Sequence, residues 1–381
     1  MADRDEYLTV PEVAQLLRVH RATVWRWIVA GKLPAVRLGD RTLRVRGDDV
    51  AGLLRPAATT KRASGVPRQP PAAAPEFGSC WAVLSATGGR GAGMYPPRFD
   101  YAVAASLDEA VEQLARYGDD AKVLAGGQSL IPLMKLRFAQ PARLVDINRL
   151  TDLRYLHEEA EGLRVGALCR HRDVERSEWL RARYPTLAAC APQVADPLVR
   201  NLGTLAGSLC HADPQGDWGA VAVALEAQLV ARSARGQRTL PATGFFLGPL
   251  TTALRPDELV TEVRFPAPKG HAFGTYLKLE RKVGDFATVG VAVFVDLQDG
   301  RVTRAGIGLA AVGPTYVKAR AAESLLVGNG LTDALVTEAA FKAAEEADPA
   351  SDHRGSAHYK RQVVRVFVGR ALRQAMAAHA A

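Results

Sequence analysis

Two glycine-bearing segments decide the fold of this chain: Ala125-Gly126-Gly127-Gln128-Ser129 and Thr204-Leu205-Ala206-Gly207-Ser208. Each follows a predicted strand or extended segment, offers successive backbone N–H groups and ends in a serine hydroxyl, and these are the groups that bind a diphosphate. Neither segment has the pattern G-x-G-x-x-G, and G-x-x-x-x-G-K-[ST] does not occur in the chain. Together they predict a dinucleotide site that is neither of the Rossmann nor of the P-loop kind.

Strand and helix signals alternate around the first glycine loop. Ser106 with Glu109 marks the start of a helix that Gly118 ends. The pattern is a βαβ-like beginning. We expect strands at 101–104, 122–125 and 143–147, a helix at 129–137, later antiparallel strands at 289–295 and 305–311, and amphipathic helices at 332–346 and 356–377.

Length and charge set bounds on the organisation of the chain. It has 381 residues, 48% of them apolar, which is enough for two or three compact domains. The net charge of +9 is concentrated at the front, where residues 1–98 hold 15 Lys and Arg against 8 Asp and Glu; the rest of the chain holds 34 against 32. A nucleic-acid partner is therefore expected only for the front of the chain.

Cysteine spacing and apolar run lengths exclude several classes of protein. Cys80, Cys169, Cys190 and Cys210 form no C-x-x-C pair and have no zinc-type spacing, so no metal or iron–sulfur site is predicted in this polypeptide. The acidic amino terminus does not resemble a signal peptide, and the longest apolar runs, such as 289–295, are too short to span a membrane. We expect a cytoplasmic protein without a transmembrane segment.

Residues 1–60 hold the signals of a small winged helix-turn-helix. Thr9 and Glu12 predict a capping box at the start of a first helix, and a second helix is predicted through residues 23–28. The alternating stretch 35–46 predicts a β-hairpin, and residues 49–54 predict a third helix.

The run TVPEVAQLLRVHRATVWRWIVAGKLPAVRLG, from Thr9 to Gly39, resembles the excisionase-like, MerR-type helix-turn-helix family. The resemblance implies that the second helix faces the DNA major groove and that nearby basic residues contact phosphates. The alternative is that these residues form a solvated face and the module is idle. The implied DNA-binding residues are Arg21, Thr23, Arg26, Lys32, Arg37 and Arg41.

Residues 61–93 are rich in Pro, Ala, Gly and Arg, and they predict a flexible linker. Order is expected to resume at Met94, which gives a hypothesis that Met94 is the natural start of an independent protein. We expect two further domains, at 94–268 and 269–381.

Four motifs follow Met94: AGGQSLIPLMKLR from Ala125, RNLGTLAGSLCHADPQGD from Arg200, FFLGPLTTALRPDELVTEV from Phe245 and KLERKVGDFATVGVAV from Lys278. With these motifs, residues 94–373 resemble the medium, FAD-binding subunit of the molybdenum hydroxylases, most closely that of aerobic carbon monoxide dehydrogenases. The resemblance implies an α+β fold: an FAD-binding domain of the vanillyl-alcohol-oxidase or PCMH type with two α/β subdomains, then a domain of antiparallel sheet and helices.

The resemblance also implies the cofactor contacts. The two glycine loops wrap the FAD diphosphate, and an acidic side chain, a lysine and an aromatic ring lie near the ribityl arm, the pyrimidine edge and the isoalloxazine. The implied FAD residues are Ala125, Gly126, Gly127, Gln128, Ser129, Leu130, Thr204, Leu205, Ala206, Gly207, Ser208, Asp217, Lys278 and Phe286.

Each of the last three has a structural alternative. Asp217 also suits an N-cap for a helix from Trp218, Lys278 suits a surface lysine on an edge strand, and Phe286 suits core packing. His211 and Asp213 lack a third ligand nearby in sequence, and we interpret them as structural.

Ala206 departs from the family pattern, which has a glycine there. If the backbone at Ala206 is left-handed, alanine costs about 1–2 kcal/mol and weakens FAD binding without abolishing it.

The function implied is an electron-transfer subunit of a molybdenum-dependent hydroxylase or dehydrogenase. Its partners would be a large subunit with the molybdenum cofactor and a small [2Fe–2S] subunit, in a heterotrimer that dimerises. The alternative from another class is a flavin-responsive regulator that binds DNA through residues 1–60.

Overall fold

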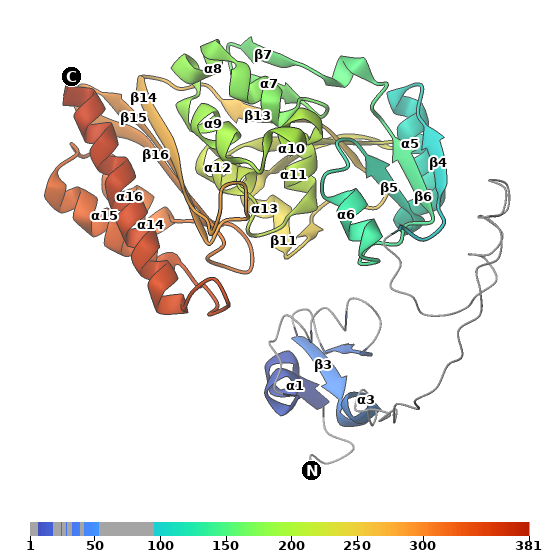
Figure 1. Ribbon diagram of the computed structural model, residues 1–381. Helices are drawn as coiled ribbons and strands as arrows, with labels where there is room; N and C mark the ends of the chain where they lie inside the picture. The colour runs from blue at the N-terminus through green and yellow to red at the C-terminus, as the bar shows by residue number, and fades with distance from the viewer. Residues whose placement is uncertain are drawn as a thin grey trace, which may run out of the picture. The chain divides into compact units, whose positions relative to one another are not determined.

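In the computed structural model, residues 7–17, 24, 28, 33–38, 42–52 and 95–380 are described (Figure 1). The chain forms two compact units, Met1–Ala92 and Gly93–Ala381. The first unit holds the helix-turn-helix signals, and the second holds both glycine loops.

The first unit is a three-stranded antiparallel sheet with helices. Its strand order is β1-β3-β2, and Leu8, Val13, Val24, Leu33, Val45 and Val50 form its core. Thr9 and Glu12 exchange backbone-to-side-chain hydrogen bonds of 2.7 and 3.3 Å, which confirms the predicted capping box. The elements are β1 (Tyr7–Thr9), α1 (Val10–Leu16), β2 (Val36–Leu38), β3 (Thr42–Arg46) and α3 (Gly47–Gly52).

The predicted hairpin and third helix are confirmed as β2-β3 and α3, the latter beginning two residues earlier than expected. Of the predicted second helix, only Val24 and Ile28 are described, and both are helical. Among the predicted DNA-binding residues, Arg37 lies in β2 with its side chain undescribed, and the others lie outside the described residues: Arg21, Thr23, Arg26, Lys32 and Arg41. The linker and Met94 also lie outside them.

The second unit begins with the predicted βαβ arrangement. A parallel sheet of order β4-β6-β5 packs against α5, whose N-cap Ser106 accepts from the Glu109 backbone N–H (3.1 Å) and whose C-cap is Gly118. The elements are β4 (Asp100–Val103), α5 (Leu107–Tyr117), η1 (Gly118–Asp120), β5 (Ala121–Leu124), α6 (Leu130–Lys135) and β6 (Arg143–Asp146).

An antiparallel sheet of order β10-β9-β13-β8-β7 and a group of short helices follow. The helix α11 contacts β13, while α9 and α12 contact the C-terminal sheet. The elements are η2 (Thr151–Leu153), β7 (Leu156–Glu159), β8 (Gly162–Gly166), α7 (His171–Arg176), α8 (Glu178–Arg183), α9 (Pro185–Cys190), η3 (Ala191–Gln193), α10 (Pro197–Leu202), α11 (Leu205–His211), α12 (Trp218–Ala224), β9 (Gln228–Ser233), β10 (Gly236–Pro241), α13 (Ala242–Phe245), β11 (Phe246–Gly248), β12 (Thr251–Thr252) and β13 (Leu259–Pro266).

The C-terminal part is an antiparallel sheet of order β14-β15-β16-β17, with α14 and α16 on it and α15 packed against both helices. The two antiparallel strands and the two helices expected here are confirmed. The elements are β14 (His271–Leu279), β15 (Val289–Gln298), β16 (Arg301–Ala310), β17 (Val317–Lys318), α14 (Arg320–Leu326), α15 (Asp333–Glu346) and α16 (Ala357–Ala380).

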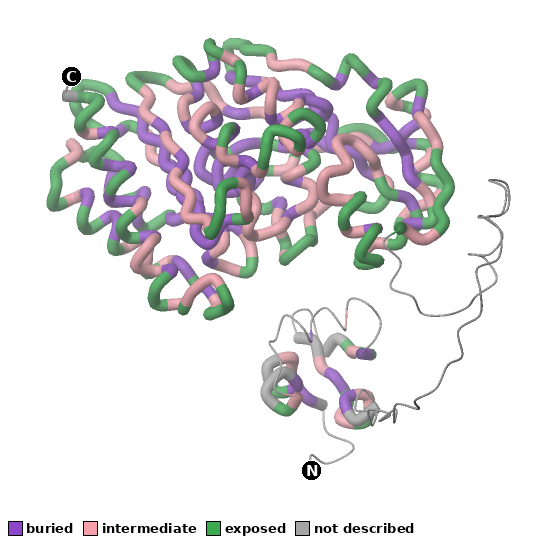
Figure 2. The backbone as a smooth tube through the Cα atoms, in the orientation of Figure 1, coloured by how far each residue is buried: buried purple, intermediate pink, exposed green. Residues whose placement is uncertain are grey.

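The strand β15 is buried over nine consecutive residues (Figure 2), because both faces of its sheet are covered. Side chains alternate between the faces of a strand. Val289, Val291, Val293 and Val295 therefore belong to the core with α14–α16, whereas Ala292 and Phe294 belong to the larger core that includes Trp218.

Candidate functional site

The first glycine loop connects β5 to α6. Gly127 has φ +71°, which a residue with a side chain rarely adopts. Gly126 lies so close to the second loop that an added Cβ would be 2.4 Å from Leu202 O and 2.7 Å from the Cα of Gly203. Gly126 is therefore in direct backbone contact with the two residues that immediately precede the second loop.

The second loop leads into α11. Thr204 is its N-cap, and Thr204 Oγ1 accepts from the Gly207 N–H at 3.0 Å. Ala206 lies inside α11 and is absent from the residues with positive φ, so the left-handed strain considered for Ala206 does not arise. Helical backbone accommodates alanine without such a cost.

A side-chain bridge holds the two loops together. Asn148 Nδ2 donates to Ala125 O at 2.8 Å, and Asn148 Oδ1 accepts from Arg170 Nη2 at 2.7 Å. Arg170 Nη1 in turn donates to Leu202 O. Asn148 and Arg170 thus connect the backbone of the first glycine loop to Leu202, two residues before the second loop. Sequence reasoning missed both residues, because neither belongs to a glycine motif.

Both loops face one cavity of about 760 Å³. Residues from the first loop, α11, the start of α12 and the loop before β15 line it, although they are far apart in sequence. Of the implied FAD residues, Leu205 is buried in the core and Lys278 does not line the cavity. Those that line it are Ala125, Gly126, Gly127, Gln128, Ser129, Leu130, Thr204, Ala206, Gly207, Ser208, Asp217 and Phe286.

A buried polar network stands behind the cavity wall. Asp217 accepts from Tyr276 Oη at 2.8 Å, and Asp217 Oδ2 is 3.2 Å from Lys278 Nζ. Lys278 also lies 3.3 Å from Glu280 Oε2 and donates to Gln193 O at 2.8 Å. Burial raises the pKa of the Asp217 carboxyl, and the Lys278 ammonium opposes that rise. Lys278 therefore does not line the cavity itself but contacts Asp217, which does.

The network corrects two sequence interpretations. Asp217 occupies the N-cap position of α12, but its side chain makes no cap hydrogen bond. The Lys278 side chain is only 1% exposed, so the surface-lysine alternative is wrong, although β14 is indeed an edge strand.

The loop before β15 forms part of the cavity rim. Phe286 is 47% exposed and lines the cavity, which excludes the alternative of core packing. Arg354 donates to Phe286 O at 2.9 Å and pairs with Asp285 at 3.1 Å, and this hydrogen bonding lowers the pKa of the Asp285 carboxyl. Arg354 thus fastens the loop that carries Phe286.

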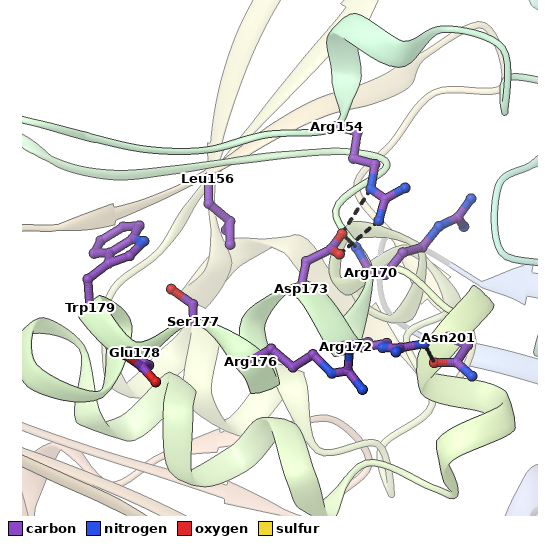
Figure 3. A pocket seen from close by; sticks show the side chains of 10 residues that line it. All are labelled: Arg154, Leu156, Arg170, Arg172, Asp173, Arg176, Ser177, Glu178, Trp179 and Asn201. Carbon is purple, nitrogen blue, oxygen red and sulfur yellow. Dashed lines mark hydrogen bonds and ion pairs between the residues drawn. The ribbon is translucent and has the colours of Figure 1, made fainter.

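A second hollow, of about 960 Å³, has Arg170 in its wall and is shown in Figure 3. Three of its four arginines already bind protein groups: Arg154 pairs with Asp173, Arg172 donates to Asn201 at 2.8 Å, and Arg170 belongs to the bridge. None of the implied FAD residues lines this hollow. The cofactor site is therefore assigned to the first cavity.

Family models match most of the chain. The FAD binding domain in molybdopterin dehydrogenase matches residues 97–268, the CO dehydrogenase flavoprotein C-terminal domain matches residues 274–375, and a helix-turn-helix domain matches residues 7–56. The carbon monoxide dehydrogenase medium chain of Hydrogenophaga pseudoflava is 43% identical over 284 residues, which are 74% of this chain and 99% of the relative. The chain belongs to the FAD-containing medium subunits of the molybdenum hydroxylases.

Other relatives and solved structures agree. The glyceraldehyde dehydrogenase medium chain of Sulfolobus acidocaldarius is 37% identical and covers 74% of this chain and 99% of its own length. The solved carbon monoxide dehydrogenase of H. pseudoflava that lacks the Mo-pyranopterin moiety is 45% identical, covers 73% of this chain and 97% of that chain, and has a TM-score of 0.71. Reconstituted CO dehydrogenase from Oligotropha carboxidovorans is 36% identical, covers 74% of this chain and 99% of that chain, and has a TM-score of 0.72.

Family membership confirms the predicted fold class, the FAD cofactor and an oxidoreductase subunit. The cavity fits the cofactor, because the backbone N–H groups of residues 126–129 and of Ala206 donate to no described residue. Such donors suit a diphosphate.

His211 and Asp213, interpreted from the sequence as structural, both line the cavity. His211 Nε2 is 4.0 Å from Asp213, and burial lowers the pKa of the His211 imidazole. Within the described residues, no group of three His, Cys, Asp or Glu side chains is arranged to hold a metal ion. No described helix is long and apolar enough to cross a membrane.

His171 is a cavity residue that sequence reasoning missed. It is only 4% exposed, lines the cavity, and accepts a hydrogen bond at Nδ1 from Trp218 Nε1 at 2.9 Å. Burial, with Arg200 and Arg170 nearby, lowers the pKa of its imidazole to about 4. His171 follows Arg170 in the chain, and its backbone N–H donates to Gly203 O, next to the second loop.

Proposed function

We propose that this chain carries electrons from iron–sulfur clusters of a partner subunit to an external acceptor. Its partners in this proposal are a large subunit with the molybdenum cofactor and a small [2Fe–2S] subunit, in a heterotrimer that dimerises in the cytoplasm. The observation that carries the proposal is the single cavity that both glycine loops, Asp217 and Phe286 line. FAD supplies the two-electron and one-electron chemistry when bound.

The roles of the chain's own residues follow from their placement. The backbone N–H groups of residues 126–129 and of Ala206 bind the diphosphate, and Asp217 accepts hydrogen bonds from ribityl hydroxyls. Tyr276 and Lys278 hold Asp217 in position. Phe286 covers the ring system and controls access to it. We also propose domain boundaries at 94–268 and 269–381, which the two family models that match residues 97–268 and 274–375 support.

Two measurements test this function. The flavin released on denaturation of the purified chain should be FAD and not FMN, because two loops of donors exceed what one phosphate needs. Two further subunits, which contain molybdenum, iron and sulfide, should co-purify with the chain from its native source. Release of FMN would contradict the cofactor site, and isolation of a flavoprotein without such subunits would contradict the proposed partners.

A second candidate function concerns residues 1–60. The helix-turn-helix match over residues 7–56 and the β2-β3 hairpin favour DNA binding by this unit. DNA affinity should then fall steeply with added salt, because each phosphate contact releases counterions. Arg26→Ala should weaken specific binding by about 1–3 kcal/mol. A DNA affinity that does not depend on salt, or that is the same in Arg26→Ala, would contradict DNA binding by residues 1–60.

A further inference from the structure

We propose that His171 is a ligand of the bound cofactor, donating a hydrogen bond from Nε2–H to an oxygen of the FAD diphosphate. The proposal rests on the FAD site described above and adds to it a side-chain donor that lies outside both glycine motifs.

Trp218 fixes the tautomer of His171. The indole Nε1–H is only a donor, so the imidazole Nδ1 that it contacts at 2.9 Å must be an acceptor. A neutral imidazole with an acceptor at Nδ1 carries its proton on Nε2. The two rings also stack, with centroids 5.9 Å apart and planes at 22°, which holds the imidazole orientation.

The Nε2–H donor lacks a protein acceptor. No described residue accepts a hydrogen bond from it, although His171 is almost completely buried. Nε2 itself is not among the fully buried polar atoms of the described residues that lack a partner, so this nitrogen reaches open space and can donate to a ligand or to water. His171 lines the FAD cavity, which provides room for either.

Gly203 keeps space open beside this nitrogen. A Cβ added at Gly203 would be 2.8 Å from His171 Nε2, and Gly203 itself lines the cavity. The backbone at Gly203 has φ −60° and ψ 143°, which any residue adopts, so its glycine serves this close approach and not a turn.

The position of His171 identifies the ligand group. Its backbone N–H bonds Gly203 O at 3.0 Å, and Gly203 Cα would be 2.7 Å from a Cβ added at Gly126. His171 therefore lies where the two glycine loops meet, and unpaired N–H donors of both loops face the same cavity. A diphosphate is the part of FAD that several convergent donors suit.

The first test measures FAD affinity of the full-length chain after removal of flavin. His171→Phe keeps a planar ring and removes the donor, so the FAD dissociation constant should rise about tenfold to a hundredfold. Binding of riboflavin, which has no phosphate, should not change. His157→Phe, the same substitution at an exposed histidine that stacks on Tyr155, is the control and should leave both affinities unchanged.

The second test reads the imidazole directly. In the full-length chain with ¹⁵N-labelled histidine, the His171 signal should show a proton on Nε2 before flavin is added. FAD and ADP should shift that signal, and riboflavin should not. Trp218→Phe removes the donor that fixes the tautomer, so Nδ1 and Nε2 protonation should then mix and FAD affinity should fall severalfold.

Three results would overturn the proposal. They are an Nε2 signal that FAD leaves unshifted, an equal shift with riboflavin, and unchanged FAD affinity in a folded His171→Phe chain. Failure of the unsubstituted chain to bind FAD would instead contradict the cofactor site as a whole.

Discussion

At positions 126 and 127, neighbouring glycines serve different purposes. Gly127 supplies a left-handed backbone, whereas Gly126 allows the backbone of Leu202 and Gly203 to approach. The sequence showed that both loops contain glycine and that both suit a phosphate. It did not show that the loops touch, because contact between residues so far apart in sequence depends on the tertiary fold.

Gly126→Ala should weaken FAD binding by forcing the two loops apart. The new methyl group would be 2.4 Å from Leu202 O, and overpacking of this kind costs about 1–3 kcal/mol, which is roughly tenfold to a hundredfold in affinity. Titration of the flavin-free chain with FAD measures it. Gly244→Ala is the matched control, since its methyl group would come no nearer than 3.8 Å to Pro241; equal effects of the two substitutions would contradict the prediction.

Ala206→Gly tests the departure from the family pattern. Because Ala206 is helical, glycine should not tighten FAD binding and should lower the free energy of unfolding by about 0.5–1 kcal/mol. Chemical denaturation and FAD titration of the same preparation give the two quantities. A tenfold gain in FAD affinity would show that the backbone at Ala206 is strained in the bound state.

At the scale of elements, the start of α12 and the strand β14 meet through Asp217 and Lys278. Neither a helical nor a strand pattern reveals such a pair, which is why the sequence left Asp217 and Lys278 with surface or capping alternatives. The short helices α7 to α10 were also not predicted, because six residues are too few to show a 3.6-residue period. Asn148, Arg170 and His171 were missed for the related reason that their partners are distant in sequence.

Lys278→Met should destabilise the chain in a pH-dependent way. Burial already raises the pKa of Asp217, and removing the Lys278 cation should raise it further. Below the ordinary pKa range of aspartate, the Asp217 carboxyl is protonated in both the folded and the unfolded state, so the substitution lowers the free energy of unfolding only slightly there. This loss should grow with increasing pH, because only the folded state resists ionisation, and reach about 3–5 kcal/mol at neutral pH. Urea denaturation between pH 4 and pH 8 measures it.

Lys342→Met is the control for that experiment. Lys342 lies on α15 and pairs with Glu345 at 2.9 Å, with both side chains well exposed. Exposed pairs contribute about 0–1 kcal/mol. A loss in Lys278→Met that does not depend on pH would mean that Asp217 does not carry the effect.

At the scale of the whole molecule, the two units should act independently. All residues that line the FAD cavity belong to the second unit. Deletion of residues 1–93 should therefore leave FAD content unchanged and abolish any DNA binding. Flavin content and electrophoretic mobility shift of the full and shortened chains measure this. Loss of FAD on deletion would show that the units depend on each other.

The alternation of side chains along β15 has a consequence for how the second unit unfolds. One strand supplies Val291 and Val293 to the helical C-terminal core and Ala292 and Phe294 to the core beneath the flavin loops. Neither core can lose this strand without exposing the other to water. The segments that match two separate family models are therefore expected to melt in one cooperative transition, and backbone amides of β15 to exchange with solvent only when the whole unit opens.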